Sequence, residues 1–500
     1  MILEQLRKRS AIALCILLFV YAFSEAIRLR WTADDAFISF RYAESFSAGH
    51  GLTFNVGEKV EGFTNFLWTI LLVPFAALGV NLEIVSWILS IFCYLLLLLV
   101  LLRRSLIAAT LPVALAGAAL HRHLHIFSTS GLETALFTLL ITAGVLEFFD
   151  KRSDGLLYDP DGPLHRQKRG FIMLGIAILV RPDGALIYGL SAIFWLVDSI
   201  RNGRSVIQGL TPHLIPFCIV FPIWLVKALY YGSPLPNTFF AKSAASPYFS
   251  QGLRYAAMFF QSYWVLGIGL LFSLVTLADR RKSSVLFFGL IGFWLLYVIY
   301  IGGDFMFARF IVPVIPLMFV LIEDAIGMLE NNSTPQTIAA VLLCAGLVFR
   351  YDPFSKIPMR DGIFEESKIY TRAARTELKT IALSIKPTLI RANPTIAFVG
   401  AQAALAYYWF PLTAIEAETG LTDKTIARTP LEKRGKVGHE KQASIAYLRE
   451  RKVNLLLRPS TEPGLHTMHI SGIPGDITIV DFNPTIIQSL LSDSRFRLVQ

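Results

Sequence analysis

The chain has 500 residues, of which 54% are hydrophobic and only 16% are charged. Soluble globular proteins carry about 25% charged residues, so this composition excludes an ordinary soluble protein and predicts a polytopic α-helical membrane protein. The net charge of +10 does not indicate nucleic-acid binding, because Lys and Arg gather in short loops between apolar segments, as the positive-inside rule predicts.

The first apolar segment, 11–29, follows the basic residues RKR at 7–9. A signal peptide has the same order, but no small-residue cleavage site follows before Trp31. We therefore expect a retained first span whose N-terminus faces the cytoplasm. The further basic clusters expected on that side are RR at 103–104, RQKR at 166–169 and DRRK at 279–282.

Apolar runs close to the length of about 20 residues that a span requires predict about eleven transmembrane helices. They lie near 11–29, 83–102, 106–120, 132–149, 168–181, 184–199, 210–230, 262–278, 284–301, 310–329 and 335–351. A twelfth run, 63–80, begins with polar residues and contains Pro74. If it crossed fully, Arg103 and Arg104 would fall outside, so it is interpreted as a re-entrant or juxtamembrane helix.

The first outer loop, 31–82, begins with the adjacent acids Asp34 and Asp35. A carboxylate at an apolar boundary can act as a general base, because partial desolvation raises its pKa. The pair could equally bind a divalent cation, pair with Arg41 or be solvated. Glu61 and Asn65 end the same loop, and we expect them at the same cavity mouth as the paired acids.

Three later outer segments also carry charges at the ends of apolar runs. Glu133 begins a span, where a helix N-terminus favours an anion, although it could simply cap that helix. RPDG at 181–184 and GGDFMFAR at 302–309 place charges at membrane depth, where they are costly and usually functional. An internal pairing of Arg and Asp at the turn is the alternative for RPDG. The residues concerned are Arg181, Asp183, Asp304 and Arg309, and the two arginines could bind a phosphate bidentately.

The segment YYGSPLPNTFFAK at 230–242 predicts an ordered outer loop that contains Asn237 and ends in Lys242. Lys242 could contact a phosphate or could be a solvated charge. HRHLH at 121–125 does not predict a metal site, because alternate spacing does not put three imidazoles on one helix face. We predict no certain metal or cofactor, although a divalent cation, Mg²⁺ or Mn²⁺, could assist.

The composition becomes that of a soluble protein after residue 351, and helix-like and strand-like runs alternate. This change divides the chain into a transmembrane domain, 1–351, and an extracytoplasmic α/β domain, 352–500. The outer loops also hold acids, arginines and a lysine that predict one outward cavity. The sequence lacks a G-x-x-x-x-G-K-[ST] or G-x-G-x-x-G loop for a soluble nucleotide, so an enzyme acting there would need a lipid-linked activated substrate.

An ordered set of motifs resembles the arabinofuranosyltransferases that add terminal arabinose to mycobacterial cell-wall arabinan. The set is DDAFISFRYAESFSAGHGLTFNVGEKVEGFTNFLW, GLETAL, RPDG, YYGSPLPNTFFAK, GGDFMFARFIVPVIPL, GLTDKTIAR and GHEK. It runs in the same order from about residue 31 to about residue 450. These enzymes are part of the GT-C class, which uses polyprenyl-phosphate sugars. One departure is AIEAETGLTD at 414–423, where Glu416 and Glu418 stand in a different pattern, which puts acceptor contacts of the C-terminal domain in doubt.

The resemblance implies an acidic catalytic motif in the first outer loop, a membrane-hugging helix, about eleven spans and an outer domain that helps to hold glycan. The motif acids correspond to Asp34 and Asp35, with Asp34 the first choice as general base. Substrate-binding roles are then expected for Arg41, Glu61, Asn65, Glu133, Arg181, Asp183, Asn237, Lys242, Asp304, Arg309 and His439.

The sequence thus predicts a glycosyltransferase in the bacterial cytoplasmic membrane, with its active site on the periplasmic side. It would move a sugar, foremost arabinofuranose, from a polyprenyl-phosphate donor to a glycan acceptor with inversion. Two alternatives stay open at this point. One is a mannosyl- or aminoarabinosyl-type transferase of the same class that acts on protein or lipid A. The other is a lipid-sugar flippase or other transporter, for which charges near the midplane of broken helices would be expected.

Overall fold

The computed structural model describes residues 2–149, 165–242, 246–279, 281–329, 333–431 and 433–499. Arg280 of the predicted basic cluster lies outside these ranges. The chain forms two compact units. The first, called the helical unit below, contains residues 1–30, 86–224 and 247–365. The second, called the mixed unit, contains residues 31–85, 225–246 and 366–500, so it is larger than the domain predicted for 352–500.

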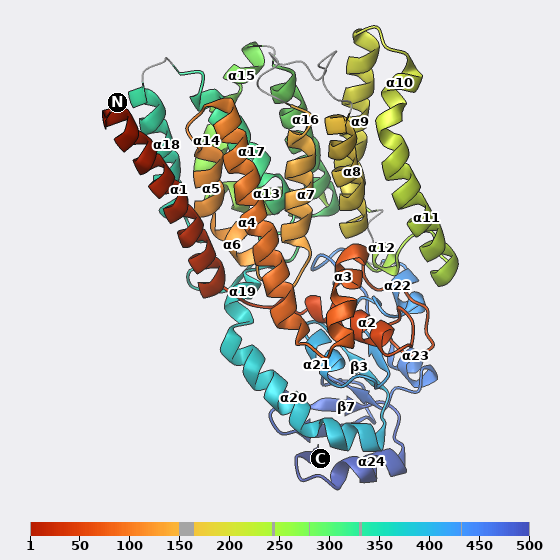
Figure 1. The fold of residues 1–500 in the computed structure, drawn as a ribbon. Helices are drawn as coiled ribbons and strands as arrows, with labels where there is room; N and C mark the ends of the chain where they lie inside the picture. Colours follow the sequence, from red (N-terminus) through yellow and green to blue (C-terminus); the bar gives the residue numbers. More distant parts are fainter. Residues whose placement is uncertain are drawn as a thin grey trace. The chain divides into compact units, whose positions relative to one another are not determined.

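The helical unit consists almost entirely of helices among its described residues (Figure 1). Their bounds are α1 Ile2–Arg28, α4 Leu82–Ala108, α5 Val113–Leu120, α6 Arg122–Phe127, α7 Thr134–Leu146, α8 His165–Val180, α9 Gly184–Arg201, α10 Val206–Leu210, η1 Thr211–His213, α11 Leu214–Tyr231, α13 Phe249–Ser262, α14 Trp264–Ser273, α15 Val275–Ala278, α16 Lys282–Ile301, η2 Val312–Val314, α17 Ile315–Ile326 and α18 Ser333–Val348. The unit boundaries fall within α4 and α11. Helices α7, α8 and α9 pack side by side (Figure 1), and a short hairpin, β1 Met359–Arg360 and β2 Ile363–Phe364, follows α18.

Five helical stretches in the described part of the chain are long and apolar enough to cross a membrane. They are Ser10–Arg28, Leu82–Ala108, Gly184–Arg201, Val206–Tyr231 and Lys282–Ile301. A sixth candidate is the pair formed by α13 and α14–α15, which is bent by 92°. The protein is therefore a multi-pass helical membrane protein. The other predicted spans correspond to the shorter helices α5, α7, α8, α17 and α18, so the total of about eleven stays a prediction.

Two further predictions concern the apolar run 63–80 and the outer loop 230–242. Helix α3, Phe66–Ala77, has 12 residues and is therefore about 18 Å long, which is shorter than a hydrocarbon core of about 30 Å. It packs against α2, Ala36–Ser47, and both are part of the mixed unit. Helix α17 of a predicted span also has 12 residues, so the expectation that 63–80 does not cross stays a prediction. The predicted outer loop 230–242 contains the short helix α12, Asn237–Ala241, and its end is followed by α13, Phe249–Ser262, whose apolar residues form one face.

The mixed unit contains a six-stranded sheet of order β4-β3-β5-β7-β6-β8. Strand β3 is parallel to β4 and β5, whereas the remaining neighbours are antiparallel. The strands are β3 Ile396–Phe398, β4 Ala414–Glu416, β5 Leu455–Leu456, β6 His466–Ile470, β7 Ile477–Ile479 and β8 Phe496–Val499. The helices are α12 Asn237–Ala241, α19 Glu366–Ile369, α20 Arg372–Ala392, α21 Ala403–Tyr408, α22 Lys424–Arg428, α23 Ile445–Glu450 and α24 Pro484–Leu491, in addition to α2 and α3.

The core of this unit lies between the sheet and the short helices α22 and α23. Ala397 and Ile415 of the parallel strands are buried in one cluster with Ile426 of α22 and Leu448 of α23. This mixture of parallel strands and helices is the α/β character predicted for the C-terminal part. It also fixes the loops between β4 and α23, which carry the GLTD and GHEK motifs.

Candidate functional site

Asp34 lies in the turn before α2 and is 4% exposed. One carboxylate oxygen is 3.1 Å from Nη1 of Arg375 on α20. The backbone N–H groups of Ala403 and Ala404 at the start of α21 donate to the same carboxylate, at 2.7 and 3.3 Å. Burial raises the pKa of Asp34, and the Arg375 guanidinium and the Ala403 N–H oppose that rise. Asp34 thus joins α2 to two C-terminal helices.

Asp35 is less buried than Asp34 and is the N-cap residue of α2. Its side chain makes no capping hydrogen bond to the helix. Burial is the first cause of the pKa shifts of two groups near Asp35: it lowers the pKa of the His439 imidazole and raises the pKa of the Tyr370 phenol. The negative charge of Asp35 acts upward on both pKa values. The two adjacent acids therefore have different surroundings, since Asp34 faces a guanidinium and a helix N-terminus, whereas the charge of the more exposed Asp35 acts on His439.

Arg41, six residues after Asp35 on α2, is fully buried and does not pair with the two acids among its hydrogen bonds. Its guanidinium donates to the carbonyl oxygens of Phe54, Ala406 and Leu412 and to the side chain of Asn55. The ring of Phe54 also lies 4.4 Å from it. These contacts satisfy the guanidinium within the protein and support a structural role, while the substrate-binding role expected from the sequence stays a prediction.

We expect Arg41→Met to lower the free energy of unfolding by about 3 kcal/mol or more, because it leaves several buried carbonyl oxygens without donors. Thermal unfolding of the purified protein in detergent, followed by tryptophan fluorescence, measures the effect. Arg372→Lys on the exposed surface of α20 is the control, and it should leave the midpoint unchanged. An equal midpoint for both variants would contradict this role.

Glu61 and Asn65 flank the entry to α3. The carboxylate of Glu61 forms an ion pair with Lys227 near the end of α11, and the Lys227 ammonium also lies 5.2 Å from the ring of Phe66. Burial raises the pKa of Glu61, and Lys227 opposes that rise. Asn65 accepts hydrogen bonds from the hydroxyls of Ser39 and Thr69, and so connects α2 to α3.

Asn237 and Lys242 begin and end α12, and they connect it to the two C-terminal motifs. The amide of Asn237 donates to the carbonyl oxygens of Gly420 and Leu421 in GLTD, at 2.7 and 3.1 Å, and its backbone N–H donates to Glu61. The aliphatic part of Lys242 lies against Gly438 of GHEK, about 3.8 Å from where a Cβ would stand. Gly438 has φ +74°, a conformation that suits glycine. Eight predicted site residues belong to the mixed unit: Asp34, Asp35, Arg41, Glu61, Asn65, Asn237, Lys242 and His439.

The other five predicted residues gather in the helical unit, where three segments distant in sequence meet. Arg181 forms a bidentate pair with Asp183 at 2.5 and 3.1 Å, and its guanidinium lies between the rings of Phe137 and Phe310. Glu133 lies 3.9 Å from Nη1 of Arg181. RPDG therefore forms the internal pair that its sequence allowed, and Glu133 adds a second carboxylate to it.

Arg309 has looser contacts with its neighbouring carboxylates. Its guanidinium nitrogens lie 3.5 Å from Asp304 and 3.8 Å from Glu133, whereas a strong charge-assisted hydrogen bond is about 2.7–2.9 Å long. Asp304 instead accepts the backbone N–H of Phe305 at 2.9 Å. All five side chains are largely buried, so the group combines two guanidiniums with three carboxylates away from water. The single outward cavity predicted from the sequence stays a prediction.

Two important contacts were not predicted from the sequence. Arg375 stands 341 positions after Asp34, on a helix whose pattern is that of an ordinary surface helix. Lys227 lies in the apolar segment 210–230, and its charge at membrane depth was the one available signal. Each residue neutralises an acid of the first outer loop.

The described residues contain no group of three or more His, Cys, Asp or Glu side chains arranged to hold a metal ion. The histidines of HRHLH illustrate this, because His123 bonds Tyr263 and Glu365 while His125 bonds the carbonyl oxygen of Ala119. A divalent cation, Mg²⁺ or Mn²⁺, stays an expectation from the sequence, and no chemical step below depends on one.

Two curated proteins resemble the chain, and both are called terminal β-(1→2)-arabinofuranosyltransferase. The one from Mycobacterium tuberculosis is 33% identical over 276 residues, which cover 51% of this chain and 42% of the relative. The one from Corynebacterium glutamicum is 27% identical over 345 residues, which cover 61% of this chain and 49% of the relative. The chain thus spans about half the length of these relatives, and no family model matches it.

Two solved structures of ArnT from Cupriavidus metallidurans also resemble the fold. The structure bound to undecaprenyl phosphate has a TM-score of 0.47 at 15% identity and covers 86% of this chain and 77% of its own. The apo structure has a TM-score of 0.40 at 14% identity and covers 87% and 78%. The curated relatives confirm the resemblance seen in the ordered motifs: over about half of its length the chain is similar to two proteins named terminal β-(1→2)-arabinofuranosyltransferase.

Proposed function

We propose that the protein is a membrane glycosyltransferase of the GT-C class. It moves a sugar, foremost arabinofuranose, from a polyprenyl-phosphate donor to a hydroxyl group of an extracytoplasmic glycan. The observation that carries this proposal is the similarity to two curated proteins whose names specify transfer of arabinofuranose. The proposed location is the bacterial cytoplasmic membrane, with the mixed unit on the periplasmic side, as the basic loops predict.

Asp35 is the general base in this proposal. Three of the about four acceptor positions of the Asp34 carboxylate are occupied, by Arg375 and by two N–H groups of α21. Asp35 is the more exposed of the two, and its charge acts on the imidazole of His439, a residue expected to contact the acceptor. The sequence favoured Asp34 as the base, whereas the proposal assigns Asp34 to positioning the loop.

The reaction is a single displacement. Asp35 takes the proton of the acceptor hydroxyl, and the oxygen of that hydroxyl forms a bond to the anomeric carbon. The bond from that carbon to the phosphate oxygen breaks on the opposite face, and polyprenyl phosphate leaves with the electron pair. The configuration inverts, because no second carboxylate acts as a nucleophile.

Arg309 is the proposed contact to the donor phosphate. Its carboxylate contacts of 3.5 and 3.8 Å are weaker than the bidentate pair of Arg181, so it is the arginine that can exchange a carboxylate for a phosphate at lower cost. A guanidinium there would stabilise the negative charge that develops on the leaving phosphate.

We expect Arg309→Gln to weaken binding of a polyprenyl-phosphoryl pentose by about 10- to 100-fold, the effect of one lost charge-assisted contact. Native mass spectrometry of the protein in detergent measures donor occupancy directly. Arg181→Gln is the comparison, and it should chiefly lower thermal stability, because it leaves Asp183 and Glu133 without their guanidinium. Donor affinity that falls only in Arg181→Gln would reverse the assignment.

Donor binding with turnover distinguishes an enzyme from a transporter. In proteoliposomes, an enzyme consumes the donor only when an acceptor is present on the side of the mixed unit. A flippase would instead move the lipid-linked sugar across the bilayer without an acceptor, and that result would overturn the proposed function.

A further inference from the structure

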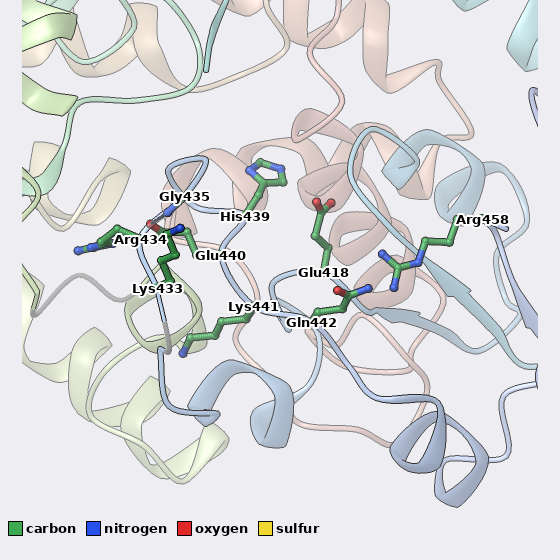
Figure 2. A pocket seen from close by; sticks show the side chains of 9 residues that line it. All are labelled: Glu418, Lys433, Arg434, Gly435, His439, Glu440, Lys441, Gln442 and Arg458. Carbon is green, nitrogen blue, oxygen red and sulfur yellow. Dashed lines mark hydrogen bonds and ion pairs between the residues drawn. The ribbon is translucent and has the colours of Figure 1, made fainter. Parts of the chain in front are cut away.

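A cavity of about 440 Å³ lies on the loop that carries GHEK, entirely within the mixed unit (Figure 2). Pockets for small ligands typically range from about 300 to 1,000 Å³, so it could hold part of a glycan chain. Its lining residues are Glu418, Lys433, Arg434, Gly435, His439, Glu440, Lys441, Gln442 and Arg458. The sequence predicted a site residue among these only at His439.

Part of this lining holds the loop in shape. Nη1 of Arg434 lies 2.7 Å from Glu440, whose other oxygen accepts the backbone N–H of Gly435 at 2.9 Å. The Lys441 ammonium is buried and donates to the carbonyl oxygens of Phe240 and Ala427. The charges of Arg434 and Glu440 thus neutralise each other. The Lys441 ammonium has two carbonyl oxygens as partners, and no carboxylate of the described residues lies within hydrogen-bond distance of it.

Among the other residues that line the cavity, positive side chains outnumber negative ones. Arg458 lies against the neutral amide of Gln442. Lys433 is exposed, and within the described residues no ion pair joins its ammonium. Apart from the pair of Arg434 and Glu440, the lining contains one acid, Glu418. It also contains three cations, Lys433, Lys441 and Arg458. In Figure 2 the Glu418 carboxylate and the Arg458 and Gln442 side chains lie on one side of the loop.

The cavity is also lined by His439. Burial, followed by the charge of Lys436, lowers the pKa of His439, whereas the charges of Glu418 and Asp35 act in the opposite direction. Gly438, next to His439, packs against Lys242. A ligand in the cavity would therefore lie beside His439 and would meet the lining cations.

We propose that this cavity binds an anionic group, a carboxylate or a phosphate monoester, on the glycan acceptor. Arabinofuranose is a neutral sugar and has no such group, so the acceptor of this protein would carry an acidic residue. Arg458 binds the anion, Lys433 adds positive charge to the lining, and Glu418 accepts hydrogen bonds from neighbouring sugar hydroxyls. This inference rests on the proposed function for its ligand class, but it concerns binding rather than transfer.

The test is direct binding of three synthetic arabinan oligosaccharides of equal length to the full chain in detergent, by titration calorimetry. One is neutral, one ends in a hexuronate and one carries a phosphate monoester. We expect the better acidic oligosaccharide to bind at least about tenfold more tightly than the neutral one, the effect of about one charge-assisted contact. Whichever acid binds more tightly identifies the source of the anion.

The variants Lys433→Gln and Arg458→Gln should each reduce this preference to less than about threefold, and Arg458→Lys should restore part of it. Arg391→Gln, an exposed arginine on α20, is the matched control and should retain the full preference. Lys433 is exposed, so its variant tests the inference even if Arg458→Gln fails to fold.

Equal affinities for neutral and acidic oligosaccharides would overturn the inference, as would a preference that neither variant reduces. If transfer to a neutral acceptor is then still observed, the proposed function stands and only this inference fails. If the acidic preference is present but no oligosaccharide is ever glycosylated, the cavity is as inferred and the proposed function fails.

Discussion

Replacement of Asp35 by Asn is expected to lower the rate of sugar transfer by about 10²- to 10⁴-fold, the usual contribution of a general base. The amide keeps the shape of the side chain but cannot take the proton of the acceptor hydroxyl. The turnover number at saturating donor and acceptor measures the effect, since donor affinity should change little. The thermal midpoint should stay within a few degrees of the wild-type value, because Asp35 makes no capping bond to α2.

Asp476→Asn is the matched control, because Asp476 is an exposed acid of the same unit that pairs with His469. It should retain full turnover. Turnover of Asp35→Asn within about threefold of the wild type would remove Asp35 from the mechanism and return the role of base to Asp34 or His439.

Replacement of Arg375 by Leu is expected to have the largest effect on stability, about 3–5 kcal/mol, because it leaves the buried carboxylate of Asp34 without its guanidinium. For a unit of this size, such a loss corresponds to a fall of about 6–20 °C in the thermal midpoint. Differential scanning fluorimetry in detergent gives the midpoint. The double variant Asp34→Asn/Arg375→Leu should recover part of the loss, since no unpaired charge is then buried.

The loss of folding stability in the Arg375→Leu variant should also depend on pH. Burial already raises the pKa of Asp34, and removal of the guanidinium raises it further. A carboxyl whose pKa is higher in the folded state than in the unfolded state stabilises the fold at low pH, and this contribution is lost as the pH rises through the folded-state pKa. The variant should therefore be closer to the wild type at about pH 5 than at about pH 8. A deficit that is constant with pH would show that lost packing, rather than the unpaired charge, is responsible.

The sequence predicted the groups of polar residues better than it predicted their individual contacts. Arg181 and Asp304 were identifiable because charges at membrane depth are rare, and the structure brings them into one group with Glu133. Arg41 looked equally functional. Its partners are mostly backbone carbonyl oxygens from distant loops, which no sequence pattern reveals.

For the helices, too, the sequence predicted the approximate segments better than their exact bounds and partners. Pro74 and the polar start of 63–80 predict a helix that does not cross, and α3 is short, as are several helices of the predicted spans. The predicted span 106–120 is interrupted instead, because α4 continues to Ala108 and α5 begins only after Pro112. Arg375 could not be predicted as the partner of Asp34, since their contact depends on how α20 and α21 pack in the mixed unit.

The most direct test of the central proposal is a transfer assay with the purified protein, a synthetic polyprenyl-phosphoryl arabinofuranose and arabinan acceptors with and without an acidic residue. Mass spectrometry of the acceptors gives the result. We predict a gain of one pentose with the wild-type protein and none with Asp35→Asn. An acceptor mass that stays unchanged while the donor is bound, or an equal gain with both proteins, would contradict the proposed transferase or its base.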